Sequence, residues 1–321
     1  MSVLVYTENW DGKFKKLSFE LVSYGAGVAG MINSSLTVLS IGKVDDEELK
    51  TLGSYGAQKI LSVDNENLNV FDSQAYTSVI SDIASAEKAT VIILANNNTG
   101  KAVAPRLSVR LKAGIGSGVN KLPLNINPFT VNKRTYSGNA FAHLVISSDI
   151  KILTLAQNSF DPVSTTNNAI IEKVNVTVDK SLVRTEVKEV LKQSGELLLT
   201  DADIVVSGGR GMKSPDNWAP LLELAEALGA ATACSRPVSD EGWRPHAEHT
   251  GQTGKIIAPN LYIAVGISGA TQHLAGVSSS KYIVAINNDK NAPIFEAAQY
   301  GIVGDAMKVL PKLVEAAKQA K

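Results

Sequence analysis

The apolar positions of this 321-residue chain repeat one theme: a short β-branched run, a polar or glycine break, and a segment with helical spacing of apolar residues. Strands that alternate with helices in this way are typical of parallel α/β sheets. In the first part of the chain the pattern predicts strands at 3–6, 36–40, 59–63 and 91–95, and helices at 18–30, 46–57, 74–87 and 101–112.

After residue 136 the pattern changes. Residues 139–147 (NAFAHLVIS) and 150–156 (IKILTLA) are two apolar runs with no room for a helix between them, which predicts an antiparallel extension of the otherwise parallel sheet. The alternation in 174–180 (VNVTVDK) predicts an edge strand, and the charged segment 184–193 follows it. We therefore predict a domain boundary near residue 193, between an N-terminal domain, 1–193, and a C-terminal domain, 194–321.

The strand–break–helix theme restarts in the C-terminal part. It predicts a doubly wound parallel α/β domain with strands at 204–206, 230–233, 261–265 and 282–286, and helices at 216–228 and 305–319. The predicted fold class is thus α/β throughout: a mostly parallel N-terminal domain with an antiparallel extension, and a doubly wound C-terminal domain.

Composition narrows the classes of partner and compartment. The 31 basic and 31 acidic residues cancel, which argues against nucleic acid or an anionic membrane as the partner. The single cysteine cannot form an intramolecular disulfide, which fits a reducing compartment. No apolar run reaches 18 residues and the start, MSVLVYTENW, lacks the pattern of a signal or transit peptide. We expect a cytoplasmic protein that is not embedded in a membrane.

Two nucleotide-binding motifs match in letters but not in context. GAGVAG at 25–30 needs a preceding strand, whereas residues 18–24 predict a helix, so we interpret it as a small-residue helix face. GQTGK at 251–255 resembles part of a P-loop, but His249 stands where the first glycine belongs and Ile256 where Ser or Thr would hold magnesium. The sequence therefore predicts no ATP hydrolysis.

Three of the four histidines, His246, His249 and His273, lie close together in the sequence. A zinc site would need helical i, i+4 spacing or a second cluster of ligands, and no cysteine or HExxH pattern supplies one. We predict no metal site.

Each of the four predicted C-terminal strands ends in small and polar residues. Arg210 lies within SGGRG at 207–211, Arg236 follows the strand that ends at 233, and two further loops lie at 266–270 and 287–289. Since the carboxyl ends of parallel strands share one edge, these loops should form a ligand site. Glycines let the backbone approach a ligand, a helix beginning at 268–270 would direct N–H groups at a phosphate, and the two arginines can bind anions. The inferred ligand is a large phosphorylated cofactor.

The same residues carry a resemblance to a known family. The motifs are SGGRG at 207–211, SRPVSDEG at 235–242, GQTGK at 251–255, APNLYIAVGISGATQHLAG at 258–276, AINND at 285–289, AP at 292–293 and YGIVGD at 300–305. Together they resemble the alpha subunit of electron transfer flavoprotein, densely from about 203 to 316. Before residue 193 the resemblance is limited to the order of elements and to pieces such as LVSYG and AVAPRLSVRL.

The resemblance implies a heterodimer with a beta subunit and one FAD held mainly by the C-terminal domain. It implies an electron carrier, not an enzyme, that takes electrons from flavin dehydrogenases such as acyl-CoA dehydrogenases and passes them singly to a membrane quinone oxidoreductase. An alternative is a subunit of an NADH-dependent flavin oxidoreductase or of a bifurcating electron transfer flavoprotein, although the chain holds no NADH fingerprint. A third is a nucleotide-sensing module built on the N-terminal domain.

The resemblance also assigns residues to FAD by motif. Arg210 should contact the phosphate and adenosine side, Asn287 and Asp305 should hold the adenosine portion, and the segment 268–273 should wrap the ribityl chain and pyrophosphate. The implied FAD contacts are Arg210, Ser235, Arg236, Thr250, Gly251, Gln252, Thr253, Ser268, Gly269, Ala270, Thr271, Gln272, His273, Asn287 and Asp305.

Three of these contacts should tune the redox chemistry, and none should be catalytic. Arg236 should lie over the flavin ring, Thr253 should hydrogen-bond near flavin N5, and His273 should reach the pyrimidine end. A cation and a donor placed where charge accumulates favour an anionic, half-reduced flavin in a site of reduced dielectric.

The sequence also departs from the family pattern. Thr250 and Thr271 stand where an aliphatic residue is usual, and His246 and His249 near the ring could shift its potential.

Overall fold

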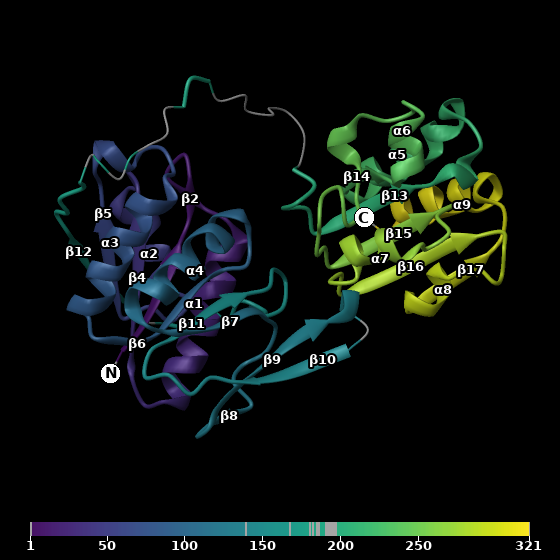
Figure 1. The fold of residues 1–321 in the computed structure, drawn as a ribbon. Coiled ribbons are helices and arrows are strands. Elements are labelled where there is room, and N and C mark those ends of the chain that lie inside the picture. Colours follow the sequence, from purple (N-terminus) through teal and green to yellow (C-terminus); the bar gives the residue numbers. More distant parts are fainter. Residues whose placement is uncertain are drawn as a thin grey trace. The chain divides into compact units, whose positions relative to one another are not determined.

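The computed structural model describes residues 2–138, 140–166, 168–179, 181, 183, 187–189 and 198–320. It divides into two compact units (Figure 1): unit 1 comprises Met1–Thr135 and Asn139–Val190, and unit 2 comprises Tyr136–Gly138 and Leu191–Lys321. The predicted boundary at residue 193 and most of the charged segment before it lie outside the described residues.

Unit 1 is built on a ten-stranded sheet whose main path runs β10-β9-β7-β11-β6-β1-β4-β5-β12, with β8 paired to β9. All strands from β7 to β12 along this path pair in parallel, and β8, β9 and β10 are antiparallel. The strands are β1 (Ser2–Thr7), β4 (Ser35–Ile41), β5 (Lys59–Val63), β6 (Ala89–Ala95), β7 (Gly114–Val119), β8 (Asn125–Ile126), β9 (Phe129–Thr135), β10 (Ala140–Val145), β11 (Lys151–Leu155) and β12 (Ile170–Lys173). A short hairpin pairs β2 (Asn9–Trp10) with β3 (Lys13–Phe14).

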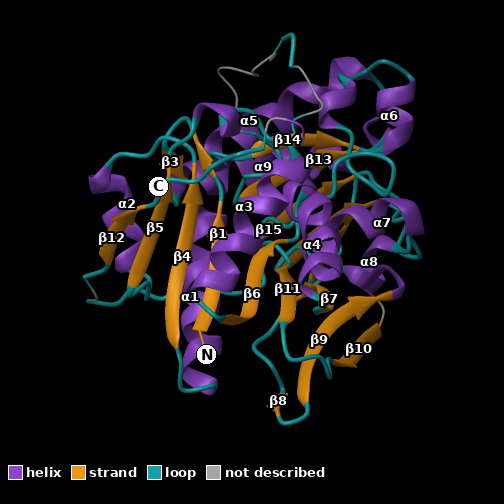
Figure 2. Ribbon diagram, turned by 60° about the vertical axis from the view of Figure 1, so that its left-hand side comes forward, coloured by secondary structure: helices purple, strands orange, loops and turns teal. Residues whose placement is uncertain are grey.

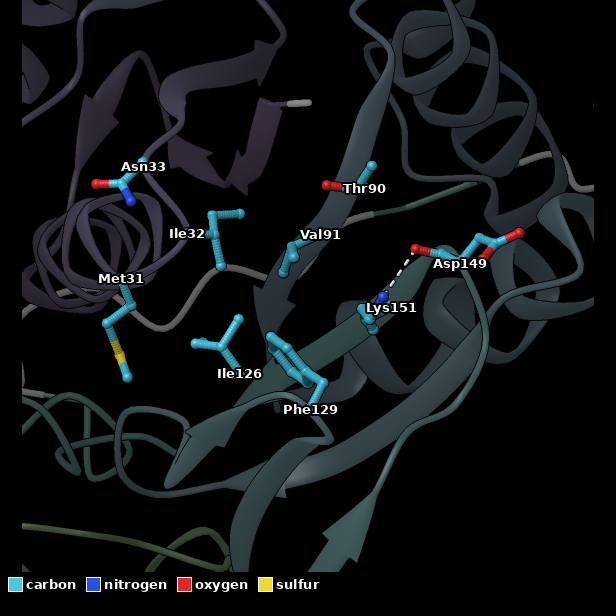
Figure 3. Close-up of a pocket in the computed structure, with 9 residues that line it drawn as sticks. All are labelled: Met31, Ile32, Asn33, Thr90, Val91, Ile126, Phe129, Asp149 and Lys151. Carbon is cyan, nitrogen blue, oxygen red and sulfur yellow. Dashed lines mark hydrogen bonds between the residues drawn. The ribbon is translucent and has the colours of Figure 1, made fainter.

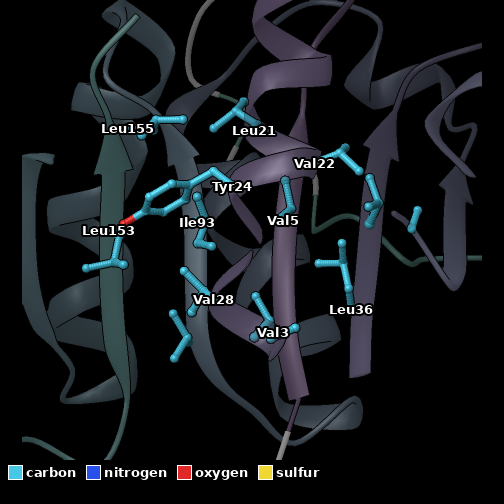
Figure 4. Packing of buried hydrophobic residues seen from close by; sticks show 14 of the residues in the cluster. Val3, Val5, Leu21, Val22, Tyr24, Val28, Leu36, Ile93, Leu153 and Leu155 are labelled. Carbon is cyan, nitrogen blue, oxygen red and sulfur yellow. The ribbon is translucent and has the colours of Figure 1, made fainter. Parts of the chain in front are cut away.

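Four helices cover both faces of this sheet: α1 (Lys16–Met31), α2 (Asp46–Gly53), α3 (Ser73–Ala86) and α4 (Asn98–Leu111). Side chains alternate along a strand, so Val3 and Val5 of β1 pack on the side of α1 and α2, as Figure 4 shows for α1, and Leu4 and Tyr6 pack on the side of α3 and α4. The central strands β1, β4, β5, β6 and β11 are buried on both faces and are mainly apolar, which is why their pattern was strong in the sequence.

The four N-terminal strands predicted from the sequence are confirmed, and so are the four helices, although the second helix ends at Gly53 and not at 57. Residues 140–145 do form an antiparallel strand, β10. The same expectation for 150–156 is wrong: β11 lies between β6 and β7 and pairs in parallel with both. The connection from β7 to β11 runs through the strands β8, β9 and β10 and contains no α-helix among its described residues. The apolar pattern alone does not show whether the strand after such a connection pairs in parallel or antiparallel.

The predicted edge strand at 174–180 is also wrong. The strand at this edge is β12, four residues earlier, and it pairs with β5. Residues 174–179 form no strand, but Val174, Val176 and Val178 are half-buried against the core beneath α3 and α4. The alternation of valines in 174–178 therefore reflects packing of one side of the segment against the core, although these residues form no strand.

GAGVAG at 25–30 lies entirely within α1, as the helix interpretation predicted. A Cβ on Gly25 would come within 2.5 Å of Val5 Cγ2, so the glycine lets the helix approach β1 closely.

Unit 2 contains a five-stranded, wholly parallel sheet in the order β14-β13-β15-β16-β17. The strands are β13 (Ile204–Gly208), β14 (Ala231–Cys234), β15 (Leu261–Val265), β16 (Tyr282–Asn287) and β17 (Tyr300–Val303). Helices α7 (Thr271–Val277) and α8 (Ile294–Ala297) pack on one face, and α5 (Ala219–Leu228), α6 (Arg236–Asp240) and α9 (Ala306–Gln319) pack on the other (Figure 2). The predicted doubly wound fold is confirmed.

Two details of unit 2 differ from the sequence prediction. The helix expected at 216–228 begins as a 3-10 turn, Pro215–Trp218, before α5. The strand β17 was not predicted, because all four of its residues are exposed and leave no buried pattern. Within the described residues, no helix combines the length and the hydropathy that crossing a membrane requires.

Candidate functional site

The strand order of unit 2 places a topological switch point at the carboxyl edge of its sheet, where doubly wound sheets have their binding crevice. From β13 the chain moves to β14 on one side and then to β15 on the other, so the loops after β13 and β15 leave in opposite directions. Open α/β sheets bind ligands at such a switch point. The loops at 207–211, 234–237, 266–270 and 287–289, predicted to share one edge, all follow strands of this parallel sheet.

Glycines bring the two central loops into backbone contact. Gly209 N donates to Val265 O at 2.8 Å and Gly211 N donates to Gly266 O at 3.0 Å. A Cβ on Gly209 would lie 2.2 Å from Gly266 O, and Gly266 itself has a φ of +61°. No side chain fits between the two loops, so they meet backbone to backbone and form what we call the bare-backbone floor of the crevice.

The GQTGK loop is fixed to α7 in the same manner. Gln252 N donates to Gln272 O at 2.8 Å, and Ile257 N donates to Gly276 O at 2.9 Å. A Cβ on Gly276 would lie 2.4 Å from the Cα of Gly251. The loop that carries Thr253, which is exposed, therefore holds a set position relative to the helix that carries His273.

The helix after β15 begins slightly later than expected. It starts at Thr271 with Ala270 as its N-cap residue, and not at 268–270. Gly269 is buried with a φ of +87°, and a Cβ there would lie 2.3 Å from Ile294 N. The exposed residues of this segment are Ser268, Ala270, Thr271 and Gln272.

Two arginines stand exposed beside the crevice loops. Arg210 pairs with Glu241 at 3.8 Å, and Arg236 donates from Nε to Asp240 at 3.3 Å. The two guanidinium side chains are 67% and 64% exposed. Exposed ion pairs contribute about 0–1 kcal/mol, so either cation can turn toward a bound anion at little cost.

Asn287 and Asp305 stabilise neighbouring loops. Asn287 donates to Ile267 O at 2.9 Å and accepts from Asp289 N at 3.0 Å, which ties the loops after β15 and β16 together. Asp305 caps α9 by accepting from Met307 N, and this bond and nearby Lys213 lower the pKa of its carboxyl. Asp305 is thus ionised at neutral pH and can accept hydrogen bonds from a ligand.

A buried polar cluster lies beneath the loops. Ser235 N donates to Gly208 O and Thr250 N donates to Cys234 O, both at 3.0 Å. His273 Nε2 lies 2.8 Å from the hydroxyl of Tyr262, a residue that the sequence analysis missed because it sits in the apolar run of β15.

Two histidine ring nitrogens of this cluster lack a hydrogen-bond partner. The Nδ1 atoms of His249 and His273 are buried and have no hydrogen-bond partner in the described part of the chain. A buried polar atom without a partner costs about 1–3 kcal/mol, so both nitrogens are open to a hydrogen bond from water or from a bound ligand.

Burial controls the charges in this cluster. It lowers the pKa of His273 to about 4, His249 adds to that effect, and the backbone at Thr250 opposes it. Burial, then His246 and Arg236, lower the pKa of His249. Both rings are neutral at pH 7. The Cys234 thiol is unreactive, because burial and then Glu248 raise its pKa to about 12.

We expect acid to destabilise unit 2 through His273. Its folded pKa, about 4, lies below the unfolded value of 6.5, so its contribution is present above pH 6.5 and is lost as pH falls toward 4. Between pH 7 and 5 the loss should be about 2 kcal/mol. Urea unfolding at the two pH values, compared with His273→Gln, measures it. His143→Gln, at an exposed histidine, is the control, and an equal loss in His273→Gln would refute the assignment.

Unit 1 has a different cavity, of about 520 Å³ (Figure 3). Its wall includes the end of α1, the start of β6 and the ring of Phe129, which lies 5.7 Å from Lys151 Nζ. It contains none of the residues predicted to contact a cofactor. Across the described residues, no three histidine, cysteine or acidic side chains gather as metal ligands would.

Comparison with known proteins gives consistent matches. Residues 198–278 match the model described as "Electron transfer flavoprotein FAD-binding domain", and residues 3–179 match "Electron transfer flavoprotein domain". The "Electron transfer flavoprotein subunit alpha" of Bacillus subtilis is 36% identical over 320 residues, covering 99% of this chain and 97% of that protein. "Protein FixB" of Clostridium saccharobutylicum is 36% identical over 99% of this chain and 96% of its own length. The "Acryloyl-CoA reductase electron transfer subunit beta" of Anaerotignum propionicum is 31% identical over the same shares.

Proposed function

From its membership of the electron transfer flavoprotein alpha subunits, whose C-terminal domain binds FAD, we propose that this chain is an electron carrier. It accepts electrons from flavin dehydrogenases, such as acyl-CoA dehydrogenases. It passes them one at a time to a membrane quinone oxidoreductase. The observation that carries the proposal is the overlap of the FAD-binding match at 198–278 with the glycine-floored crevice of unit 2. The single cysteine supports a reducing compartment, and we place the protein in the cytoplasm.

The crevice has features that suit FAD. A Cβ at Gly209 or Gly211 would collide with the backbone of Gly266, so only glycines let these two loops meet, and His273 Nδ1 is a buried atom without a hydrogen-bond partner in the described part of the chain. When bound, FAD supplies the one- and two-electron chemistry, while the protein supplies binding, orientation and electrostatics.

Particular residues would hold the cofactor. Arg210 would neutralise the phosphates and Asn287 and Asp305 would hold the adenosine portion. Ser235, Thr250, Gly251, Gln252 and the segment 268–272 would complete the binding surface. The exposed ion pairs that Arg210 and Arg236 make in this structure are weak enough to be exchanged for cofactor contacts.

Near the flavin ring, Arg236, Thr253 and His273 would set the redox properties. A guanidinium close to the ring stabilises negative charge on it, and neutral His273 can offer a hydrogen bond without adding a second cation. His249 is also neutral at pH 7 and is close enough to His273 to lower its pKa, so we place His249 near the flavin ring as well.

Unit 1 would provide the surface for the beta subunit. Strand β10 forms one end of the ten-stranded sheet, and Phe141 and Val145 on it are 56% and 53% exposed. Exposed apolar side chains on an edge strand are commonly covered by a partner. We therefore assign assembly to unit 1 and FAD binding to unit 2.

Co-expression with a beta subunit tests the proposal. We expect a yellow complex that contains FAD in about equimolar amount with this chain and that an acyl-CoA dehydrogenase with its substrate reduces. Absorbance of the purified complex and a reductive titration measure both. A complex that forms but is colourless would sink the proposal, and a yellow complex that no flavin dehydrogenase reduces would contradict the assigned donor.

A second candidate function is favoured by one relative. The Anaerotignum propionicum protein is named as an electron transfer subunit of a reductase, so this chain could serve inside an enzyme complex that uses NADH or bifurcates electrons. Rapid reduction of the flavin by NADH, with no dehydrogenase present, would favour this function over the carrier role.

A further inference from the structure

His273 and Tyr262 form a buried pair at the heart of unit 2. Tyr262 lies on β15 and is fully buried, and His273 lies on α7 and is 7% exposed. Their Nε2 and hydroxyl atoms are 2.8 Å apart, with the ring centroids 6.0 Å apart. Bonds within this buried pair are shielded from water, so its geometry can fix a proton on one atom.

The direction of this bond determines what His273 offers to a ligand. A neutral imidazole carries one proton, either on Nδ1 or on Nε2. If the tyrosine hydroxyl donates to Nε2, the ring proton must sit on Nδ1, and Nδ1 becomes a donor. If Nε2 donates to the tyrosine, Nδ1 is only an acceptor.

The surroundings favour donation by the tyrosine. Neither neighbouring hydroxyl takes the phenolic proton, since Thr250 Oγ1 donates to Cys234 O at 3.3 Å and Ser207 Oγ makes no hydrogen bond within the described part of the chain. Tyr262 is fully buried, so its proton needs an acceptor within the protein, and His273 Nε2 lies at hydrogen-bond distance from it. Both imidazole neighbours in the cluster, His249 and His273, are neutral at pH 7.

We propose that Tyr262 is a positioning residue: its hydroxyl donates to Nε2 of His273, keeps the ring proton on Nδ1, and thereby presents Nδ1–H as a fixed donor to an acceptor atom of the bound flavin. This inference rests on the proposed contact between His273 and FAD. It accounts for the buried Nδ1 that lacks a partner in the chain. Tyr262 itself touches no cofactor and acts through His273.

The test uses the FAD-loaded heterodimer, labelled with ¹⁵N-histidine, with and without Tyr262→Phe. This substitution removes the hydroxyl and keeps the ring in its apolar surroundings. Tyr282→Phe, at a residue that is 47% exposed on β16, is the matched control. The first readout is the position of the His273 proton by NMR, and the second is the potential of the first electron transfer to FAD.

We expect the wild-type ring to carry its proton on Nδ1 and Tyr262→Phe to move part of the population to Nε2. The potential of the first electron transfer should fall, because the protein then binds one-electron-reduced FAD about tenfold less tightly relative to oxidised FAD. For one electron, a tenfold change corresponds to about 59 mV. Tyr282→Phe should change neither readout.

A wild-type ring protonated on Nε2 overturns the proposal, even if Tyr262→Phe does not fold. An unchanged potential and proton position in Tyr262→Phe also overturn it. His273→Leu separates the two levels: if it leaves the potential unchanged, the assumed contact between His273 and the flavin is wrong. If His273→Leu shifts the potential and Tyr262→Phe does not, only the role of Tyr262 fails.

Discussion

Gly276→Ala should weaken FAD binding by at least about 100-fold. The added Cβ would lie 2.4, 2.5 and 2.7 Å from the Cα, N and C atoms of Gly251, all of them backbone. Backbone cannot turn aside as a flexible side chain can, so α7 and the GQTGK loop must separate, which carries His273 and Thr253 out of place together. Overpacking of this kind costs about 1–3 kcal/mol, and the misplaced contacts add to it.

Gly30→Ala is the matched control for this change. Gly30 is also helical, but a Cβ there would meet nothing within 4 Å. We expect it to leave FAD binding unchanged and to stabilise α1 by up to about 1 kcal/mol. Titration of FAD-free protein with FAD and circular dichroism measure the two effects. If Gly276→Ala binds FAD as tightly as Gly30→Ala does, the fixed loop–helix contact is not needed for the cofactor.

Arg236→Ala should lower the amount of one-electron-reduced flavin that accumulates during stepwise reduction. A charge-assisted contact of about 1.5–3 kcal/mol near the ring corresponds to a tenfold or larger change in the equilibrium that forms this species. Loss of the exposed Arg236–Asp240 pair should hardly affect stability. A reductive titration followed by absorbance and electron paramagnetic resonance measures the accumulation.

Two controls make the Arg236 result specific. Asp240→Asn removes the partner and leaves the cation, so accumulation should be retained or increased. Arg106→Ala removes an exposed arginine of α4 whose guanidinium bonds to Ala102 O within the same helix, and it should have no effect. An unchanged yield in Arg236→Ala would remove Arg236 from the role proposed for it.

Much of the fold could be predicted because its central strands are buried, and a buried strand can be recognised from a short run of apolar residues. The central strands of both sheets bury side chains on both faces, so runs such as 91–95 and 261–265 stand out from the sequence. Topology is non-local, and therefore the parallel pairing of β11 between β6 and β7 was mistaken for an antiparallel extension. Strands with glycine-rich or exposed residues, such as β7 and β17, gave no apolar signal.

The candidate site shows the same division. Glycines and arginines that follow β-branched runs pointed to the loops at the sheet edge, because those residue types have few reasons to cluster there. Tyr262 could not be distinguished from core, since an apolar run hides the one hydroxyl that meets His273. The pairing of Gly251 with Gly276 was equally invisible, because residues 25 positions apart meet only once α7 has packed.

The bare-backbone floor of the crevice also bears on protein engineering. Where Gly209, Gly211 and Gly266 meet, substitutions cannot add a new recognition group, because any side chain would collide with main chain. Exposed Arg210 and Arg236 at the rim carry no such restriction. To alter cofactor preference or redox potential, substitutions can therefore be made at Arg210 and Arg236, whereas Gly209, Gly211 and Gly266 must be kept.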